Sequence, residues 1–178
     1  DMKKINPEYF NMDQVAAQMA DDMTPDYDLA MALWKENVRE CRILATMLMP
    51  PEKMLPEVAD IWMEQTDTIE IAEQAAINLF QHLPYAAGKA YQWMASSREL
   101  TQLCGFHVVS RLFMRGFEPN ERGINEFLDQ AVTALQGNSL SVRKAALNSV
   151  QHFASLGLVY ERLANSALRM VTKSKEPD

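Results

Sequence analysis

An apolar stripe with the period of an α-helix is the feature that most constrains how this chain folds. In residues 121–136 the apolar side chains follow the spacing i, i+3, i+4, i+7, i+8 and i+11: Ile124, Phe127, Leu128, Ala131, Val132 and Leu135. Residues 141–156 repeat this spacing, with Ser149 as the polar member of the stripe. Because this spacing puts the side chains on one face of a helix, both segments predict helices that bury that face. No segment shows the alternation that predicts a β-strand.

Residues that favour helix ends separate the apolar stripes. The linker QGNSLS holds Gly137, which favours the end of one helix, and serines, which favour the start of the next. Thr24 followed by Pro25 predicts another helix start, and Ser96 and Glu99 have the spacing of a capping box. These signals predict helices over the ranges 12–22, 25–36, 38–49, 51–65, 67–81, 84–95, 98–115, 121–136, 141–156 and 159–171.

The predicted helices pair in chain order through short connections. The pairs are 25–36 with 38–49, 51–65 with 67–81, 84–95 with 98–115, and 121–136 with 141–156. Their starts lie 26, 33 and 37 residues apart, a spacing that suits a stack of helical repeats. We therefore predict an all-α fold, an α-solenoid of stacked antiparallel helix pairs. It forms a single domain over residues 1–178 with a flexible tail at 172–178. A helix bundle is the alternative that the loose period leaves open.

Composition excludes several classes of protein. No apolar run approaches the roughly 20 residues that span a membrane. The two cysteines, Cys41 and Cys104, are too few and too far apart to predict a disulfide framework or a cysteine zinc cluster. No signal sequence opens the chain, so we expect a cytoplasmic location. The net charge of −7 argues against a generally basic surface that coats nucleic acid.

The sequence holds no pattern typical of a metal or cofactor site. His82, His107 and His152 lie in different predicted helices, and none forms an i, i+4 pair with another. The glycines are isolated, so no glycine-rich loop is present to hold a phosphate. We expect no metal and no cofactor.

Three acids recur every third residue in the stretch DTIEIAEQ, which opens the predicted helix 67–81. Asp67, Glu70 and Glu73 therefore lie along one side of that helix. One interpretation is structural, because acids near a helix N-terminus complement its dipole. The other is functional, with a carboxylate that acts on a ligand.

Three stretches share a spacing of tryptophans and charged residues with a known family. LWKENVRECRILATMLM has Leu33-Trp34, Glu40, Arg42 and Ala45, and IWMEQTDTIEIAEQ continues the pattern with Trp62. VRKAALNSVQHF follows as a later Lys-Ala helix. Over about residues 25–156, this arrangement resembles the DNA alkylation repair family, the AlkC- and AlkD-like alkylpurine DNA glycosylases. The resemblance implies HEAT-like repeats in a right-handed solenoid. These residues also have a structural interpretation, with the tryptophans in the core and Glu40 and Arg42 in salt bridges between repeats.

The resemblance also implies where the family's functional side chains fall. The glycosylases have a tryptophan that packs against the lesion nucleotide, and a carboxylate that stabilises positive charge on the sugar. These positions correspond to Ile69 and Glu73. An arginine that grips the DNA backbone corresponds to Gln102, and a second tryptophan corresponds to Asn148, four residues after Lys144. Three of the four functional side chains are therefore replaced, and the carboxylate is retained.

Charge is distributed unevenly between the two helices of a pair. The first helices at 25–36, 51–65 and 121–136 carry −2, −3 and −2, and the second helices at 38–49, 98–115 and 141–156 carry +1, +2 and +2. The helix at 67–81 carries −3. Because second helices line the DNA groove in the related family, the resemblance implies a basic lane for DNA or another partner: Arg39, Arg42, Arg111, Arg115, Arg143 and Lys144. Ordinary solvated helix faces are the alternative interpretation.

Two hypotheses of function follow from the resemblance. In the first, the glycosylase site has degenerated, and the concave surface binds a DNA structure or a protein without excising bases. In the second, the protein is an active alkylpurine glycosylase with Glu73 as the electrostatic carboxylate and an aromatic from Tyr85, Tyr91 or Trp93. For the first hypothesis we expect Ile69, Gln102 and Asn148 to come together and duplex DNA to bind weakly.

Overall fold

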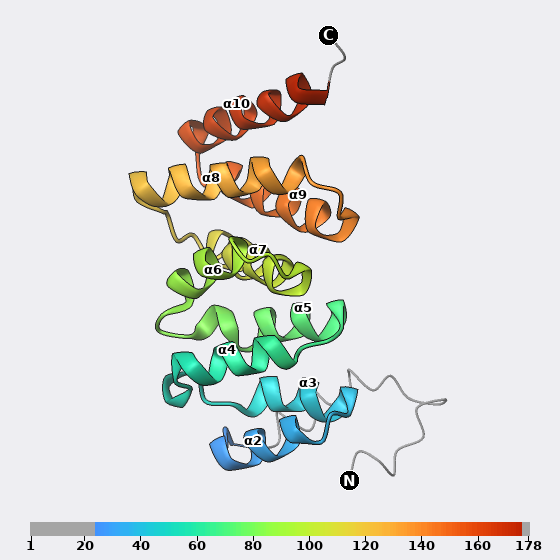
Figure 1. Ribbon diagram of the computed structural model, residues 1–178. Helices are drawn as coiled ribbons and strands as arrows, with labels where there is room; N and C mark the ends of the chain where they lie inside the picture. The colour runs from blue at the N-terminus through green and yellow to red at the C-terminus, as the bar shows by residue number, and fades with distance from the viewer. Residues whose placement is uncertain (1–23, 176–178) are drawn as a thin grey trace, which may run out of the picture. The chain divides into compact units, whose positions relative to one another are not determined.

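The computed structural model describes residues 24–175, and within this range every regular element is a helix (Figure 1). The predicted helix at 12–22 lies outside the described residues. No helix in the described range is long and apolar enough to cross a membrane. The chain divides into two compact units, Asp1–Pro84 and Tyr85–Asp178. A single domain over residues 1–178 stays a prediction.

Over its described residues, 24–84, the first unit holds two helix pairs. They are α2 (Tyr27–Lys35) with α3 (Arg39–Leu48), and α4 (Pro56–Gln65) with α5 (Ile69–Asn78). Short 3-10 turns, η2 (Pro51–Lys53) and η3 (Phe80–His82), precede α4 and follow α5. Asn37, with φ 49°, makes the turn between α2 and α3 in the left-handed region that asparagine tolerates.

Between residues 85 and 175, the second unit contains five helices. They are α6 (Ala86–Met94), α7 (Glu99–Met114), α8 (Glu121–Leu135), α9 (Leu140–Ala154) and α10 (Leu158–Lys175). Helix α7 packs against both α6 and α9, and α10 packs against α8 and α9. Phe113, Phe127 and Phe153 form the core between α7, α8 and α9, with ring centroids 5.0–5.6 Å apart. Helix α10 continues to Lys175, so residues 172–175 of the predicted tail are helical.

Hydrogen bonds in the first unit show that successive repeats lie side by side in register. Trp34 Nε1 donates to Gln65 Oε1, 31 residues away, at 2.7 Å. Asn78 Nδ2 donates to Thr46 Oγ1, 32 residues away, at 3.2 Å. Near the starts of α3 and α5, Arg39 pairs with Glu70, again 31 residues away. The nearly constant offset means that α3 and α5 run parallel, as the second helices of consecutive repeats do.

Helix starts differ from the predicted ones where a better cap or a proline intervenes. The N-cap of α2 is Asp26, whose carboxylate accepts from Leu29 N, rather than Thr24. The predicted helix 51–65 is broken before Pro56, because proline lacks an N–H and disfavours helical backbone in the preceding residue. The N-cap of α9 is Ser139, which confirms the serine start predicted from QGNSLS.

The start of α7 also departs from the predicted capping box. Arg98 is the N-cap residue, and Ser96 Oγ accepts from its backbone N–H. The Glu99 carboxylate turns instead to α9, where it accepts hydrogen bonds from the hydroxyls of Ser139 and Ser141. The predicted capping box of Ser96 and Glu99 is therefore wrong, because the Glu99 carboxylate forms its hydrogen bonds with α9.

A stack of two tryptophans and an arginine fills the centre of the first unit. The rings of Trp34 and Trp62 are parallel within 2°, with centroids 4.3 Å apart. The Arg42 guanidinium lies over Trp34, 4.5 Å from the ring centroid. Arg42 donates from Nε to the Trp34 carbonyl at 3.2 Å and from Nη1 to the Gln65 carbonyl at 2.7 Å. With 7% of Arg42 exposed, this cation joins α2, α3 and α4 within the core.

Helices α6 and α7 approach so closely that only glycine fits at position 105. A Cβ on Gly105 would lie 2.5 Å from the backbone N of Met94 and 2.9 Å from the carbonyl O of Ala90. Both are backbone atoms, so neither can rotate away. By contrast, a Cβ on Gly88 in α6 would meet no atom within 4 Å.

Replacing Arg42 tests its place in the core. Arg42→Met keeps much of the volume and removes both hydrogen bonds, and bonds from a charged donor contribute about 1.5–3 kcal/mol each. We expect the free energy of unfolding in urea to fall by at least about 1.5 kcal/mol. Arg39→Met is the control, because an exposed ion pair contributes only about 0–1 kcal/mol. Unchanged stability in Arg42→Met would contradict a structural role.

Replacing the two glycines tests the close contact of α6 and α7. Gly105→Ala forces the backbones apart and should destabilise by about 1–3 kcal/mol, as overpacking does. Gly88→Ala should stabilise by about 0.5–1 kcal/mol, because alanine is the better helix former. Thermal unfolding followed by circular dichroism measures both. A higher melting temperature for Gly105→Ala would disprove the contact.

Candidate nucleic-acid interface

Both arginines of α3 are engaged within the fold. Arg42 is buried, and its guanidinium donates to two backbone carbonyls. The prediction that Arg42 belongs to the basic lane is therefore wrong, because its side chain does not reach a surface ligand. Arg39 is partly exposed and forms a two-pronged ion pair with Glu70, with Nη2 2.9 Å from Oε2 and a second bond from Nε to Oε1. Arg39 Nη1 also lies 3.4 Å from Glu40.

The three acids of DTIEIAEQ occupy different environments. Asp67 precedes α5, whose N-cap is Thr68, so the stripe is shorter than predicted. The hydrogen bond from Arg39 holds the pKa of Glu70 below its usual value. Glu70 is therefore part of the link between α3 and α5. Glu73 lies one turn into α5 and is half-buried. Its action on a ligand stays a prediction.

In the second unit, α7 and α9 run parallel. At their starts, Glu99 accepts hydrogen bonds from Ser139 and Ser141 of α9, the latter at 2.9 Å. At their ends, the rings of Phe113 and Phe153 meet at 5.6 Å between centroids. The side-chain hydrogen bonds lower the pKa of the Glu99 carboxyl. These contacts fix which residues of the two helices lie at the same level.

The four predicted cations of the second unit form two pairs at opposite ends of these helices. Arg111 and Arg115 lie near the end of α7, and Arg143 and Lys144 lie near the start of α9. Since Glu99 lies level with Ser139 and Ser141 at the start of α9, the centres of the two pairs are about 10 residues apart along the helices, or about 15 Å at 1.5 Å per residue. Lys144 and Arg115 are exposed, and the other two are half-buried.

The helix dipole accounts for the position of a cation in one of the two pairs and not for the other pair. Cations in the last turn of a helix complement the dipole, so Arg111 has a structural explanation. Cations near a helix N-terminus gain nothing from the dipole, and the first turn of α9 holds no acid that would offset them. Arg143 and Lys144 are therefore the cations that the helices themselves explain least.

The positions of the family's functional side chains fall in both units. Ile69 is the first residue of α5 and 44% exposed, in the first unit. Gln102 on α7 and Asn148 on α9 are half-buried in the second unit. With Glu99 of α7 level with the start of α9, Asn148 lies about five residues further along the helix direction than Gln102. This corresponds to a separation on the order of 8 Å along the helix axes. That Ile69 joins these two stays a prediction.

Two of the three aromatics that would serve an active glycosylase belong to the packing. The Tyr91 hydroxyl donates to the Gly123 carbonyl at 3.0 Å, and burial raises its pKa to about 12. Trp93 is 3% exposed. Trp93 therefore presents no ring to a ligand, whereas Tyr91 and Tyr85, which caps α6, are both half-buried.

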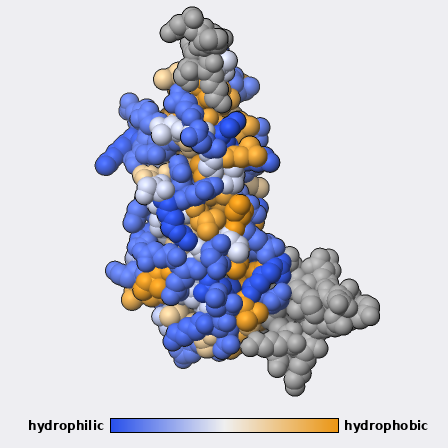
Figure 2. Space-filling model, turned by 45° about the vertical axis from the view of Figure 1, so that its right-hand side comes forward, coloured by the Kyte–Doolittle hydropathy of each residue, from blue (hydrophilic) through white to orange (hydrophobic). Residues whose placement is uncertain are grey.

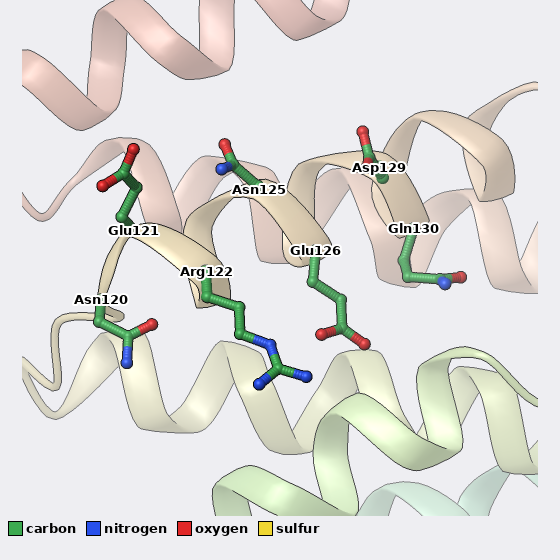
Figure 3. A pocket seen from close by; sticks show the side chains of 7 residues that line it. All are labelled: Asn120, Glu121, Arg122, Asn125, Glu126, Asp129 and Gln130. Carbon is green, nitrogen blue, oxygen red and sulfur yellow. The ribbon is translucent and has the colours of Figure 1, made fainter.

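Two surface hollows lie in the second unit. The first follows α8, with Glu121, Asn125 and Asp129 turned to one side of the helix and Arg122 and Glu126 to the other (Figure 3). Its three acids make it a poor site for phosphate. The second hollow lies at the ends of α7 and α9 and is lined by Phe113, Met114, Gly116, Glu118, His152, Ser155 and Leu156. No group of three potential metal ligands occurs among residues 24–175.

Apolar side chains interrupt the polar surface, as Figure 2 shows for one face. Most are aliphatic, and Phe117, just after α7, is aromatic and 55% exposed. The sequence carried a signal for it, because an apolar residue directly after an arginine and a glycine is typical of a helix C-terminus. In the described part of the chain, the exposed large apolar residues are Leu55, Ile61, Ile69, Met114, Phe117, Leu140, Leu147, Leu158, Val159 and Met170.

Comparison with solved structures shows that this fold occurs elsewhere. A solved structure from a new family of proteins related to the HEAT-like repeat DNA glycosylases, with affinity for branched DNA structures, has a similar fold. The TM-score is 0.76 at 18% identity, and the match covers 86% of this chain and 66% of that one. This likeness confirms the predicted all-α solenoid of HEAT-like helix pairs. None of the curated proteins compared with this chain matches it.

The sequence itself gives the family. The model of the DNA alkylation repair enzyme family matches residues 10–150, which is well over half of the chain. This range includes Trp34, Trp62 and Lys144, three of the residues on which the resemblance rests. The chain belongs to the DNA alkylation repair enzyme family.

Proposed function

We propose that this protein binds branched DNA and does not excise bases. The absence of base excision is inferred from Ile69. Excision of a cationic alkylated base is favoured by an aromatic face beside the base and an anion near the sugar. At the position of the family's tryptophan, the surface of α5 offers a 44% exposed aliphatic side chain. Glu73 retains the anion without the ring.

The placement of the cations supports DNA binding of modest strength. With Arg42 buried and Arg39 paired to Glu70, the second unit supplies four of the six predicted cations. Affinity for duplex DNA rests largely on phosphate contacts, and the net charge of −7 opposes them. We therefore infer a dissociation constant for linear duplex on the order of micromolar or weaker at physiological salt.

Branched DNA suits the separated cation pairs better than a linear duplex. Two pairs about 15 Å apart along α7 and α9 can contact strands that diverge at a junction. The solved structure of similar fold belongs to proteins with affinity for branched DNA, which favours the same ligand here.

An active glycosylase is the second candidate, and the half-buried Glu73 carboxylate favours it. We propose a cytoplasmic location and a ligand that is DNA rather than another protein.

Base release from methylated duplex DNA tests the absence of excision. We expect no alkylated purine in the supernatant above the level of a protein-free control, because no ring at Ile69 holds the base. Chromatography of the released bases measures this. Glu73→Gln is the matched variant. Release by the wild-type chain that disappears in Glu73→Gln would replace this proposal with the active glycosylase.

Charge reversal tests the cation pairs. Arg111→Glu and Lys144→Glu should each weaken binding to a four-way junction, and each should reduce the slope of log affinity against log salt by about 1, since a phosphate contact is lost. Fluorescence anisotropy over a salt series measures both quantities. Arg122→Glu makes the same change of charge on α8, beside acids that repel phosphate. An equal effect of Arg122→Glu would mean that net charge alone governs binding.

A further inference from the structure

We infer that Phe117 and Arg115 form a stacking platform for an unpaired base at the branch point of DNA. This inference rests on the proposed binding of branched DNA and names the part of the ligand that the end of α7 contacts. It starts from an exception in the packing. Of the six phenylalanines in residues 24–175, five are at most 5% exposed and lie in the core, whereas Phe117 is 55% exposed.

Phe117 is exposed in a fixed position. Gly116 takes φ 84°, the left-handed backbone that ends a helix. Its N–H donates to the Phe113 carbonyl at 2.9 Å, and the Phe117 N–H donates to the Leu112 carbonyl at 3.1 Å. This pair of bonds is the Schellman arrangement, which places the next side chain beside the last turn of the helix. The backbone that carries the exposed ring is therefore held in one conformation.

A planar cation lies beside the ring. The Arg115 guanidinium carbon is 5.1 Å from the Phe117 ring centroid, within the range of a cation–π contact. A guanidinium both stacks on flat groups and donates hydrogen bonds to phosphate. Arg111, one turn earlier on α7, adds a second cation. An aromatic face with two arginines is the combination by which proteins hold unpaired nucleotides.

The hollow next to Phe117 supplies groups that a base edge can use. His152 and Ser155 of α9 are among its lining residues, and Met114, 51% exposed, adds an apolar wall. Glu118 is the one acid in this lining, and it accepts a hydrogen bond from the Tyr160 hydroxyl. The Glu118 carboxylate is therefore tied to α10, and the Arg115 guanidinium is the cation that lies over the ring.

The platform distinguishes branched from linear DNA. In a linear duplex each base already stacks on its neighbours, so a surface ring gains nothing from it. At a branch point, base pairs end and bases can turn outward, and each base stacked on an aromatic ring changes affinity by about 1–3 kcal/mol. An apolar partner protein would use the ring without the arginines, and the choice of DNA follows from this charge complementarity.

The test compares wild type with Phe117→Ala and Phe117→Leu on a three-way junction and on a linear duplex. Leucine keeps the apolar contact of the helix end and removes the aromatic face. We expect both variants to lose about tenfold in affinity for the junction and less than twofold for the duplex. Met170→Ala, which removes another exposed apolar side chain from α10, should change neither. Fluorescence anisotropy measures affinity.

A fluorescent 2-aminopurine at the branch point provides a second readout. Stacking on Phe117 should change its emission on binding of the wild-type chain and leave it unchanged with Phe117→Leu. Equal junction affinity and equal emission for wild type and Phe117→Leu would overturn the platform and leave the binding of branched DNA intact. Equal losses on junction and duplex would also overturn it. A wild-type chain that binds neither DNA would overturn the proposed function itself.

Discussion

Lateral packing of parallel second helices is the contact on which both units depend. Helix α3 lies against α5 in one unit, and α7 lies against α9 in the other. Each contact joins residues a full repeat apart, so neither can form from one helix pair alone. A carboxylate marks the start of each: Glu70 with Arg39, and Glu99 with the serines that open α9. Because each acid also sits at the N-terminus of its own helix, it complements a dipole while it sets the register.

The fold was largely predictable because its information is local. Apolar stripes at 121–136 and 141–156 predict α8 and α9 to within a residue or two, since a helix that buries one face must repeat its apolar residues. Boundaries failed where two local signals competed. Thr24-Pro25 read as a cap although Asp26 was the better one, and Pro56 broke a helix that the apolar pattern continued. The split of 67–81 into α5 and a 3-10 turn had no signal that spacing could show.

The candidate site was less predictable because its properties are tertiary. Counting charge along second helices treats every arginine as a surface cation, but Arg42 stacks on Trp34 and bonds to carbonyls from two other helices. Likewise, Glu99 has the spacing of a capping residue and serves as a link between helices. Neither outcome can be read from neighbours in sequence. The correspondence of Ile69 to the family's tryptophan rests on the resemblance alone and stays a prediction.

The contact at Gly105 bears on how the second unit can respond to a ligand. Helices usually meet through a layer of side chains, which can change rotamers and let one helix slide on the other. At Gly105 the backbone of α6 occupies that layer, so the two helices have one permitted alignment. Helices α6 and α7 therefore cannot slide along each other at this contact. The contacts of Phe113 with Phe127 and Phe153 are different in kind, because they join side-chain rings that can tilt without breaking a hydrogen bond.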